Sequence, residues 1–372
     1  MTPNSSEKNS IDLGLGSQSK FEISEENKNI RYYNPLFANA LRKIPQSTPP
    51  IWFMRQAGRY HSHYRKLKEK YSFMELCKNP ELAAEVALGP VAEFQFDVSI
   101  LFSDLLFPLE ALGFGLTYNP GPILSKQLTD ISELRNLHSL DDAVHFLEFQ
   151  KVAMQKTRAI LPDDVSLIGF VGGAWTLYSY ATIGNHQGSI VKPKTNTDLI
   201  KGFYAKILPL LIENIRLQII GGAEVVMVLD TSAGDLSPLQ FQSYVVEPLS
   251  EITKQFPNRI GYYTKHSTKD QLILLQNVEG LAGIGVDHRF SIEKLMQEKV
   301  SNGFLQGNFD QTLLFLPYNE FEKAFRQYLR PIQNLSIEER AGWVSGLGHG
   351  ILPATPEENV KRMVNIIREV FQ

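Results

Sequence analysis

Two arginines, Arg55 and Arg59, follow a short apolar run, Ile51–Met54, and are separated from each other by three residues that end in Gly58. The run is typical of a buried strand, and the glycine allows the backbone to turn where the strand stops. A guanidinium keeps its charge at any working pH and forms paired hydrogen bonds with a carboxylate. We therefore expect an acidic ligand with several carboxylates at this strand end. For these two residues alone, ordinary surface ion pairs are the alternative.

The composition is that of a globular protein, with 372 residues, 43% of them hydrophobic and 21% charged. A net charge of −3 and a pI near 6.3 argue against a nucleic-acid partner. The single cysteine, Cys77, excludes an internal disulfide and any site built from several thiolates. No run of about 18 apolar residues occurs, so we expect no membrane insertion.

Residues 1–31 are rich in Ser, Asn, Lys and Glu and contain no apolar stretch. Their acidic residues also argue against a transit peptide, which is poor in acids. We expect a disordered or loosely docked tail over residues 1–31, then a single domain over residues 32–372, in the cytoplasm.

Eight short apolar runs alternate with longer amphipathic stretches from residue 51 onward. This alternation predicts a parallel sheet covered by helices, and eight such units predict a single closed (β/α)8 barrel of the TIM type. A doubly wound open sheet is the alternative, but no glycine-rich phosphate loop follows a strand. The expected strands are Ile51–Gln56, Val98–Asp104, Val165–Val171, Ala223–Asp230, Arg259–Lys265, Leu281–Asp287, Gly303–Phe309 and Gly342–Leu347.

Polar or titratable residues end nearly all of these runs, where a barrel builds its active site. Asp104 closes an apolar run, and a carboxylate in such surroundings can stabilise a cation that develops during a reaction. Capping of the next helix is the structural alternative for Asp104. His349 stands between Gly348 and Gly350, so it can approach a ligand closely and hydrogen-bond an acetate or propionate group.

Several segments, taken in order, resemble the uroporphyrinogen decarboxylase family of the haem pathway. The resemblance runs from about residue 34 to the C-terminus, and the Arg-Gln-Ala-Gly-Arg segment is its most specific part. The segments are Arg55–Tyr60, Phe102–Asp104, Trp175–Leu177 with Tyr180, Gly307–Asp310 and Gly348–Pro353.

The resemblance implies a (β/α)8 barrel that acts as a homodimer without a metal or an organic cofactor. It also implies removal of the four acetate carboxyl groups of a tetrapyrrole, uroporphyrinogen III, to give coproporphyrinogen III and CO2. The catalytic residues that it implies are Asp104, Arg55, Arg59, Tyr180 and His349. The substrate contacts that it implies are Arg55, Gln56, Ala57, Gly58, Arg59, Lys68, Asp104, Tyr180, Thr231 and His349.

Loss of CO2 from an acetate leaves electrons on carbon, and a pyrrole protonated on a ring carbon can accept them. The substrate therefore supplies its own electron sink, and the protein must add a fixed anion, a proton donor and groups that hold carboxylates. We assign the anion to Asp104. Arg55 is the expected proton donor, through a bound carboxylate or water, and Arg59 orients and neutralises the substrate.

The sequence departs from the family pattern at several positions, none of which removes a charged catalytic residue. The usual Leu-Pro-Glu after the second arginine is His61-Ser62-His63, and the usual Gly-Ala-Pro-Trp lacks its proline. We interpret these histidines, with His266 and His288, as residues at the rim of the site, because no matching carboxylate or thiolate pattern indicates zinc. The remaining departures are at Gly173, Ala174, Leu229, Gly346 and Gln311.

Three other functions compete with this prediction. Corrinoid- or zinc-dependent methyltransferases share the barrel, but their thiolate ligands cannot be built from Cys77 alone. A catalytically inactive porphyrinogen-binding protein would have lost the arginines and the aspartate, which this chain keeps. A related enzyme with an altered substrate is the third alternative.

Overall fold

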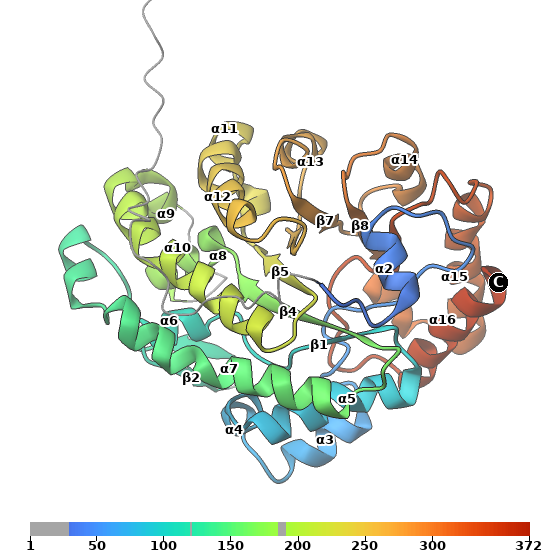
Figure 1. The fold of residues 1–372 in the computed structure, drawn as a ribbon, viewed down its shortest axis with the longest axis horizontal. Helices are drawn as coiled ribbons and strands as arrows, with labels where there is room; N and C mark the ends of the chain where they lie inside the picture. The colour runs from blue at the N-terminus through green and yellow to red at the C-terminus, as the bar shows by residue number, and fades with distance from the viewer. Residues whose placement is uncertain (1–29, 120, 185–190) are drawn as a thin grey trace, which may run out of the picture.

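The computed structural model describes residues 30–119, 121–184 and 191–372, so the predicted tail lies almost wholly outside the described residues. The main element is a curled parallel sheet of seven strands in the order β1-β4-β5-β6-β7-β8-β9, with helices around its outside (Figure 1). The strands are β1 (Val98–Ile100), β4 (Ser166–Gly172), β5 (Val225–Leu229), β6 (Ile260–Tyr263), β7 (Leu281–Gly285), β8 (Phe304–Phe309) and β9 (Trp343–Leu347).

The helices connect successive strands and cover the outer face of the sheet, as the alternating sequence pattern predicts (Figure 1). The longer ones are α5 (Pro80–Phe94), α7 (Leu140–Ile160), α8 (Ala174–Ile183), α10 (Thr197–Ile220), α12 (Glu247–Gln255), α15 (Tyr318–Gln333) and α16 (Glu357–Val370). The shorter ones are α2 (Pro35–Leu41), α3 (Ser62–Lys68), α4 (Phe73–Lys78), α6 (Phe107–Ala111), α9 (Val191–Thr195), α11 (Pro238–Phe241), α13 (Lys269–Leu275) and α14 (Ile292–Gln297). Three short 3₁₀-helices are η1 (Ile131–Asn136), η2 (Ala233–Asp235) and η4 (Gln311–Phe315), and η3 (Gln242–Val246) is a short π-helix.

Two apolar cores result from this arrangement. The smaller one takes at least one side chain from each of the seven strands, among them Val98, Ile168, Met227, Tyr263 and Phe304. Because neighbouring residues of a strand point to opposite faces, the other strand side chains pack outward in the larger core beneath the helices. The inside of the curled sheet is therefore filled with side chains and supports a site at the strand ends.

The first predicted strand, Ile51–Gln56, is wrong in extent. Only Ile51 makes a β-bridge, parallel to Ser345 of β9. The Gln56 side chain replaces a neighbouring strand, because its Nε2 donates to the carbonyl of Val98 (3.0 Å) and its Oε1 accepts from the amide of Phe53 (3.4 Å). The segment that carries the arginines is consequently a loop anchored by a buried amide.

Residues 50–52 lie between the two ends of the sheet. On one side, Trp52 N donates to the carbonyl of Ser345 (3.1 Å), and Ser345 N donates to that of Pro50 (2.9 Å). On the other side, Asp97 N donates to the carbonyl of Ile51 (3.2 Å). The Asp97 carboxylate also accepts from Ile51 N (2.7 Å), so the same aspartate binds this segment twice.

A two-stranded antiparallel hairpin, β2 (Leu116–Tyr118) and β3 (Pro122–Leu124), was not predicted from the pattern. It follows α6 and is preceded by Gly113 and Gly115, which have φ values of 91° and 67°. Such positive φ values favour glycine, so these two residues allow the tight entry into the hairpin. The hairpin matters because it brings Tyr118 to the candidate site.

The amino ends of the strands hold a buried carboxyl group, Glu224, whose side chain is only 2% exposed. It accepts hydrogen bonds from Ser166 Oγ (2.7 Å) and Leu167 N (3.0 Å). Burial raises the pKa of this carboxyl to about 7, although these hydrogen bonds and the nearby Arg158 oppose the shift. In the unfolded chain this carboxyl has its ordinary pKa of 4.5. Between pH 4.5 and about 7, the folded protein therefore holds a proton here that the unfolded chain releases.

This raised pKa makes the stability depend on pH with a defined sign. The contribution of Glu224 is complete below its ordinary value of 4.5 and is lost as the pH rises through about 7. We expect Glu224→Gln to remove about 3 kcal/mol of this pH dependence from the free energy of unfolding. Urea unfolding below pH 4.5 and above pH 7 measures this change in the free energy of unfolding, with the exposed Asp163→Asn as control. Equal pH slopes for wild type and Glu224→Gln would contradict the assignment.

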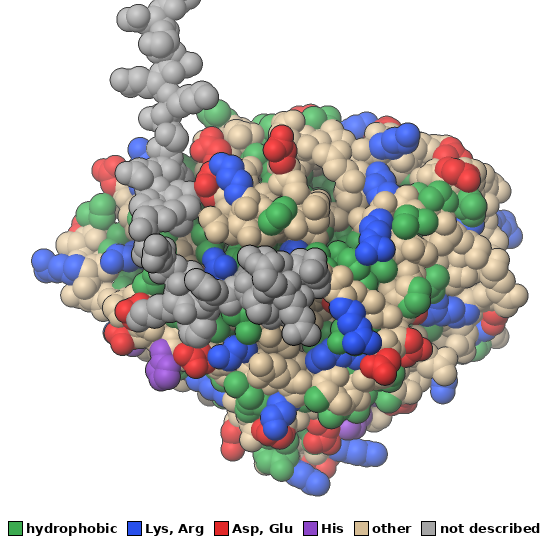
Figure 2. Space-filling model, in the orientation of Figure 1, with side chains coloured by type: hydrophobic (Ala, Val, Ile, Leu, Met, Phe, Trp, Pro, Cys, Tyr) green, Lys and Arg blue, Asp and Glu red, His purple; other side chains and the backbone are tan. Residues whose placement is uncertain are grey.

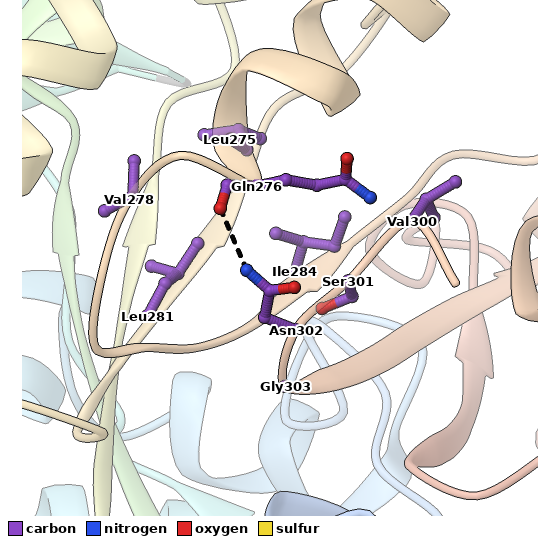
Figure 3. Close-up of a pocket in the computed structure, with 9 residues that line it drawn as sticks. All are labelled: Leu275, Gln276, Val278, Leu281, Ile284, Val300, Ser301, Asn302 and Gly303. Carbon is purple, nitrogen blue, oxygen red and sulfur yellow. Dashed lines mark hydrogen bonds between the residues drawn. The ribbon is translucent and has the colours of Figure 1, made fainter. Parts of the chain in front are cut away.

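The same end of the sheet has a small pocket between β7, β8 and the end of α13 (Figure 3). The nine lining residues include no charged side chain, and the Asn302 side chain donates to the carbonyl of Gln276 (2.9 Å). We assign no chemistry to this pocket, since neither charge nor a titratable group lies in its wall.

The visible surface is of mixed charge. Acidic and basic side chains alternate over the face seen in Figure 2, in keeping with the net charge of −3. Within the described residues, no helix combines the length and apolar character needed to cross a bilayer.

Candidate active site

A cavity of about 170 Å³ lies at the carboxyl ends of the strands. Five predicted site residues line it: Arg55, Ala57, Asp104, Thr231 and His349. The other lining residues are mainly apolar: Met54, Ile100, Leu101, Phe102, Ser103, Leu105, Phe170, Leu229, Tyr263 and Gly350. A few polar and charged groups in a largely apolar wall are typical of a site that binds a small organic molecule.

Asp104 lies in the loop after β1. Its Oδ1 accepts a hydrogen bond from the amide of Leu106 (2.8 Å), so the structural alternative of a local turn is also correct. Burial raises the pKa of the Asp104 carboxyl, while the Leu106 amide, the neighbouring Tyr118 hydroxyl and the charge of Arg55 oppose the shift. No cation of the described residues forms an ion pair with it, so one carboxylate faces the cavity without a bound counter-charge.

Arg55 adopts a left-handed backbone conformation with φ of 58°, which costs a non-glycine residue on the order of 1 kcal/mol. Its side chain passes against Gly350, where a Cβ atom would lie 2.5 Å from Arg55 Cδ and 2.7 Å from Cγ. The two loops are also joined by a hydrogen bond from Ile351 N to the carbonyl of Met54 (3.0 Å). The glycine after His349 thus makes room for the arginine.

His349 lies beside Tyr263, the last residue of β6. The Tyr263 hydroxyl is 3.0 Å from Nδ1 of His349 and donates to the carbonyl of Gly348 at 2.8 Å. The two rings are nearly parallel, with 14° between their planes. Burial and the charge of Arg55 lower the pKa of His349 to about 4, so its imidazole is neutral near pH 7.

Tyr180 is buried on α8, at 9% exposure, and lies outside the cavity lining. Burial and the charge of Asp104 raise the pKa of Tyr180 to about 12, so its hydroxyl stays protonated. The electrostatic effect of Asp104 nevertheless puts the two groups in one neighbourhood.

The start of α8 is fixed by a side chain from a neighbouring strand end. Asp230, directly after β5, accepts from Thr176 N (2.8 Å) and Thr176 Oγ1 (2.6 Å) in the first turn of the helix. Gly173 at the N-cap has no side chain of its own to do this. The carboxylate therefore caps the helix from outside.

The comparisons decide the family. The family described as "Uroporphyrinogen decarboxylase (URO-D)" matches residues 32–370. The chain belongs to the uroporphyrinogen decarboxylase family. The prediction of the family from its motifs is thereby confirmed.

Curated relatives agree over nearly their whole length. A uroporphyrinogen decarboxylase from Syntrophotalea carbinolica is 34% identical over 90% of this chain and 98% of its own. Those from Koribacter versatilis and Carboxydothermus hydrogenoformans are 31% and 32% identical, over 90% and 91% of this chain and 96% and 97% of their own. A solved methyltransferase from Methanosarcina mazei has a TM-score of 0.71 at 20% identity, covering 92% of this chain and 99% of its own, and shows the fold alone.

Four residues inferred from the family resemblance lie outside the cavity lining, in addition to Tyr180. The Gln56 side chain is 1% exposed and bonds to backbone, as described above. Gly58 is half-buried, and Arg59 and Lys68 are exposed, the latter on α3. Their contacts with a substrate remain predictions.

Two tyrosines near the site were not predicted. Tyr118 precedes an Asn-Pro-Gly-Pro segment, a strong turn signal that could have indicated the hairpin. Tyr263 ends an apolar run two residues before Lys265, in the position where a barrel strand points residues at its site. The signals were present, but neither specifies a contact.

The interpretation of His61 as a residue at the rim of the site is wrong. This side chain is fully buried against α5, and its Nε2 lies 2.7 Å from Glu93 Oε2. His61, Glu93 and Glu357 bring ligand-type atoms within 4.8 Å of one another. Glu357 is already bound by Ser62 N (2.8 Å) and by the guanidinium of Arg65 (3.1 Å). That nearby positive charge disfavours a metal cation.

Gly173 leads to a prediction on stability. A Cβ atom there would lie 2.2 Å from Cγ of the buried Asp230, so one of the two must shift. We expect Gly173→Ala to destabilise the protein by roughly 1–3 kcal/mol, the usual cost of overpacking. Urea unfolding measures it against Gly121→Ala, where a Cβ meets nothing within 4 Å. Equal midpoints would show that the capping carboxylate can move aside freely.

Proposed function

We propose that this protein removes the acetate carboxyl groups of uroporphyrinogen III as CO2 and so forms coproporphyrinogen III. Family membership over nearly the full length supports this reaction. The observation that carries the proposal is Asp104, a carboxylate in a largely apolar cavity with Arg55 beside it and no ion-pair partner among the described residues. This is the environment that stabilises a cationic ring while acidic side chains are held nearby.

The chemistry needs no group beyond the substrate ring and these side chains. Protonation of a pyrrole carbon creates a cation, and the bond between the acetate methylene and its carboxylate then breaks. Its electron pair passes to the ring and CO2 leaves. A second proton then converts the methylene to a methyl group, and loss of the proton first added to the ring carbon restores the neutral pyrrole. Asp104 would accept pyrrole N–H hydrogen bonds and stabilise the cation throughout.

The roles of the arginines follow from their positions. Arg55 lies in the cavity wall near Asp104, so we propose it as the proton donor through a bound carboxylate or water. Arg59 is exposed beside the same loop and would bind outer carboxylates, together with Lys68. Tyr180 and Thr231 would complete the contacts, with Gln56, Ala57 and Gly58 shaping the loop.

The family resemblance also supports a closed eight-unit barrel. Residues 50–52 would act as the eighth strand, since their backbone bonds to Ser345 on one side and to Asp97 on the other. We likewise retain the homodimer and the cytoplasmic location as proposals that rest on the resemblance.

A thiolate-metal methyltransferase is disfavoured by the chain itself. The sole cysteine, Cys77, is buried on α4, and burial raises the pKa of its thiol well above the ordinary value. A buried neutral thiol is neither a metal ligand nor a nucleophile. An inactive binding protein and an enzyme with another substrate are distinguished only by assay.

The test is an anaerobic assay of the purified protein with uroporphyrinogen III, with and without a chelator. We expect successive loss of carboxyl groups until four remain on each tetrapyrrole, at the same rate in both conditions. Binding without loss of carboxyl groups would indicate the inactive protein. Loss of activity with the chelator would contradict the metal-free reaction.

A further inference from the structure

Tyr263 makes two short contacts with one hydroxyl group. Its oxygen lies 2.8 Å from the carbonyl oxygen of Gly348 and 3.0 Å from Nδ1 of His349. The side chain is fully buried, and its ring stacks on the imidazole with centroids 5.9 Å apart. Both contacts are therefore held in place by packing.

The number of hydrogens decides the direction of both bonds. A carbonyl oxygen can only accept, so the single hydroxyl hydrogen of Tyr263 must point to Gly348. Otherwise two oxygen atoms would face each other at 2.8 Å without a hydrogen between them. The oxygen of Tyr263 then accepts from His349, which requires a hydrogen on Nδ1.

The neighbours of His349 favour a neutral ring. Burial lowers the pKa of its imidazole, and the charges of Arg55 and Lys265 lower it further, while Asp287 opposes the shift. A neutral imidazole carries one hydrogen, so with Nδ1 protonated Nε2 has none. Among the described residues, the one hydrogen bond of this ring is to Tyr263, which leaves Nε2 for the cavity.

We propose that Tyr263 is a positioning residue that holds His349 with its hydrogen on Nδ1, so that Nε2 faces the cavity as a hydrogen-bond acceptor. Such an acceptor binds a pyrrole N–H of a tetrapyrrole and cannot donate to a carboxylate. The sequence-based expectation that His349 hydrogen-bonds an acetate or propionate is thereby replaced, and carboxylate binding passes to the arginines. This inference rests on the proposed function for its substrate, but not for the position of the hydrogen.

Nitrogen NMR of histidine-labelled protein near neutral pH tests the hydrogen position directly. The signals of His349 are assigned by their loss in His349→Asn. We expect Nδ1 protonated and Nε2 bare in the wild type, and hydrogen on Nε2 in Tyr263→Phe. The same variant should lower kcat/KM for uroporphyrinogen III roughly tenfold, because a donor now faces the pyrroles. Tyr262→Phe removes the neighbouring hydroxyl, which faces Asp230, and should leave the hydrogen on Nδ1.

The outcomes separate the inference from the proposed function. A wild-type His349 with its hydrogen on Nε2, or a Tyr263→Phe variant that keeps it on Nδ1, would overturn the role of Tyr263 even if decarboxylation is observed. A wild-type protein with the hydrogen on Nδ1 but no decarboxylation would overturn the proposed function and leave the positioning role standing.

Discussion

Asp104→Ala is expected to lower kcat/KM for uroporphyrinogen III by roughly 10²–10³, the usual loss when one preorganised electrostatic partner is removed. The carboxylate lines the cavity and has no cation of the described residues paired with it, so its charge is available to the substrate. Steady-state kinetics under anaerobic conditions measures the loss. The exposed Asp163→Ala, at the amino end of β4, serves as the matched control and should be unaffected.

Asp104→Asn separates charge from shape. The amide oxygen can still accept from Leu106 N, so the local turn survives while the negative charge is lost. We expect nearly the same loss of activity as in Asp104→Ala. Because burial raises the pKa of Asp104 above its ordinary value of 3.8, activity of the wild type should already fall with acidification at a pH above that value. Near wild-type rates in folded Asp104→Asn would rule out the electrostatic role.

Gly350→Ala is expected to lower kcat/KM by about 10²-fold, through displacement of a catalytic group rather than its removal. The added methyl group would occupy the space of Arg55 Cδ and Cγ, at 2.5 and 2.7 Å. The arginine is a flexible side chain, so it should move while the backbone stays. Gly121→Ala, with nothing within 4 Å of its new methyl group, controls for the gain of a side chain.

A double variant identifies the cause of that loss. If Gly350→Ala acts through the guanidinium, it should cost little further activity in an Arg55→Ala background, because the displaced group is already absent. Independent, additive losses would instead mean that Gly350 is needed for its own backbone position, and the contact with Arg55 would then have no functional weight.

The sheet was largely predictable because burial on both faces makes parallel strands read as short apolar runs. The predicted Val165–Val171 lies one residue before β4 at both ends, and the predicted Gly303–Phe309 differs from β8 only by its first residue. Ile51–Gln56 reads the same way, but only Ile51 makes a β-bridge, and the rest of the segment is a loop. There a glutamine side chain supplies the hydrogen bonds, and a pattern of apolar residues does not reveal such a partner.

The candidate site was predictable in its residue types and less so in its geometry. Arg55, Asp104, Thr231 and His349 meet in one cavity because parallel strands end at one edge. The direction of the Gln56 side chain and the contact of Tyr263 with His349 depend on tertiary packing, which no local spacing encodes. The hairpin of Tyr118 was missed because its strands are only three residues long, below the length at which alternation is visible.

The capping of α8 by Asp230 has a mechanical consequence. This one residue joins the first turn of the helix that carries Tyr180 to the end of β5, and it is followed directly by Thr231. A single carboxylate thus couples the two elements that carry the proposed substrate contacts Tyr180 and Thr231. A ligand that contacts either element should restrict the motion of the other. Substrate contacts with Tyr180 and with Thr231 should therefore strengthen or weaken together.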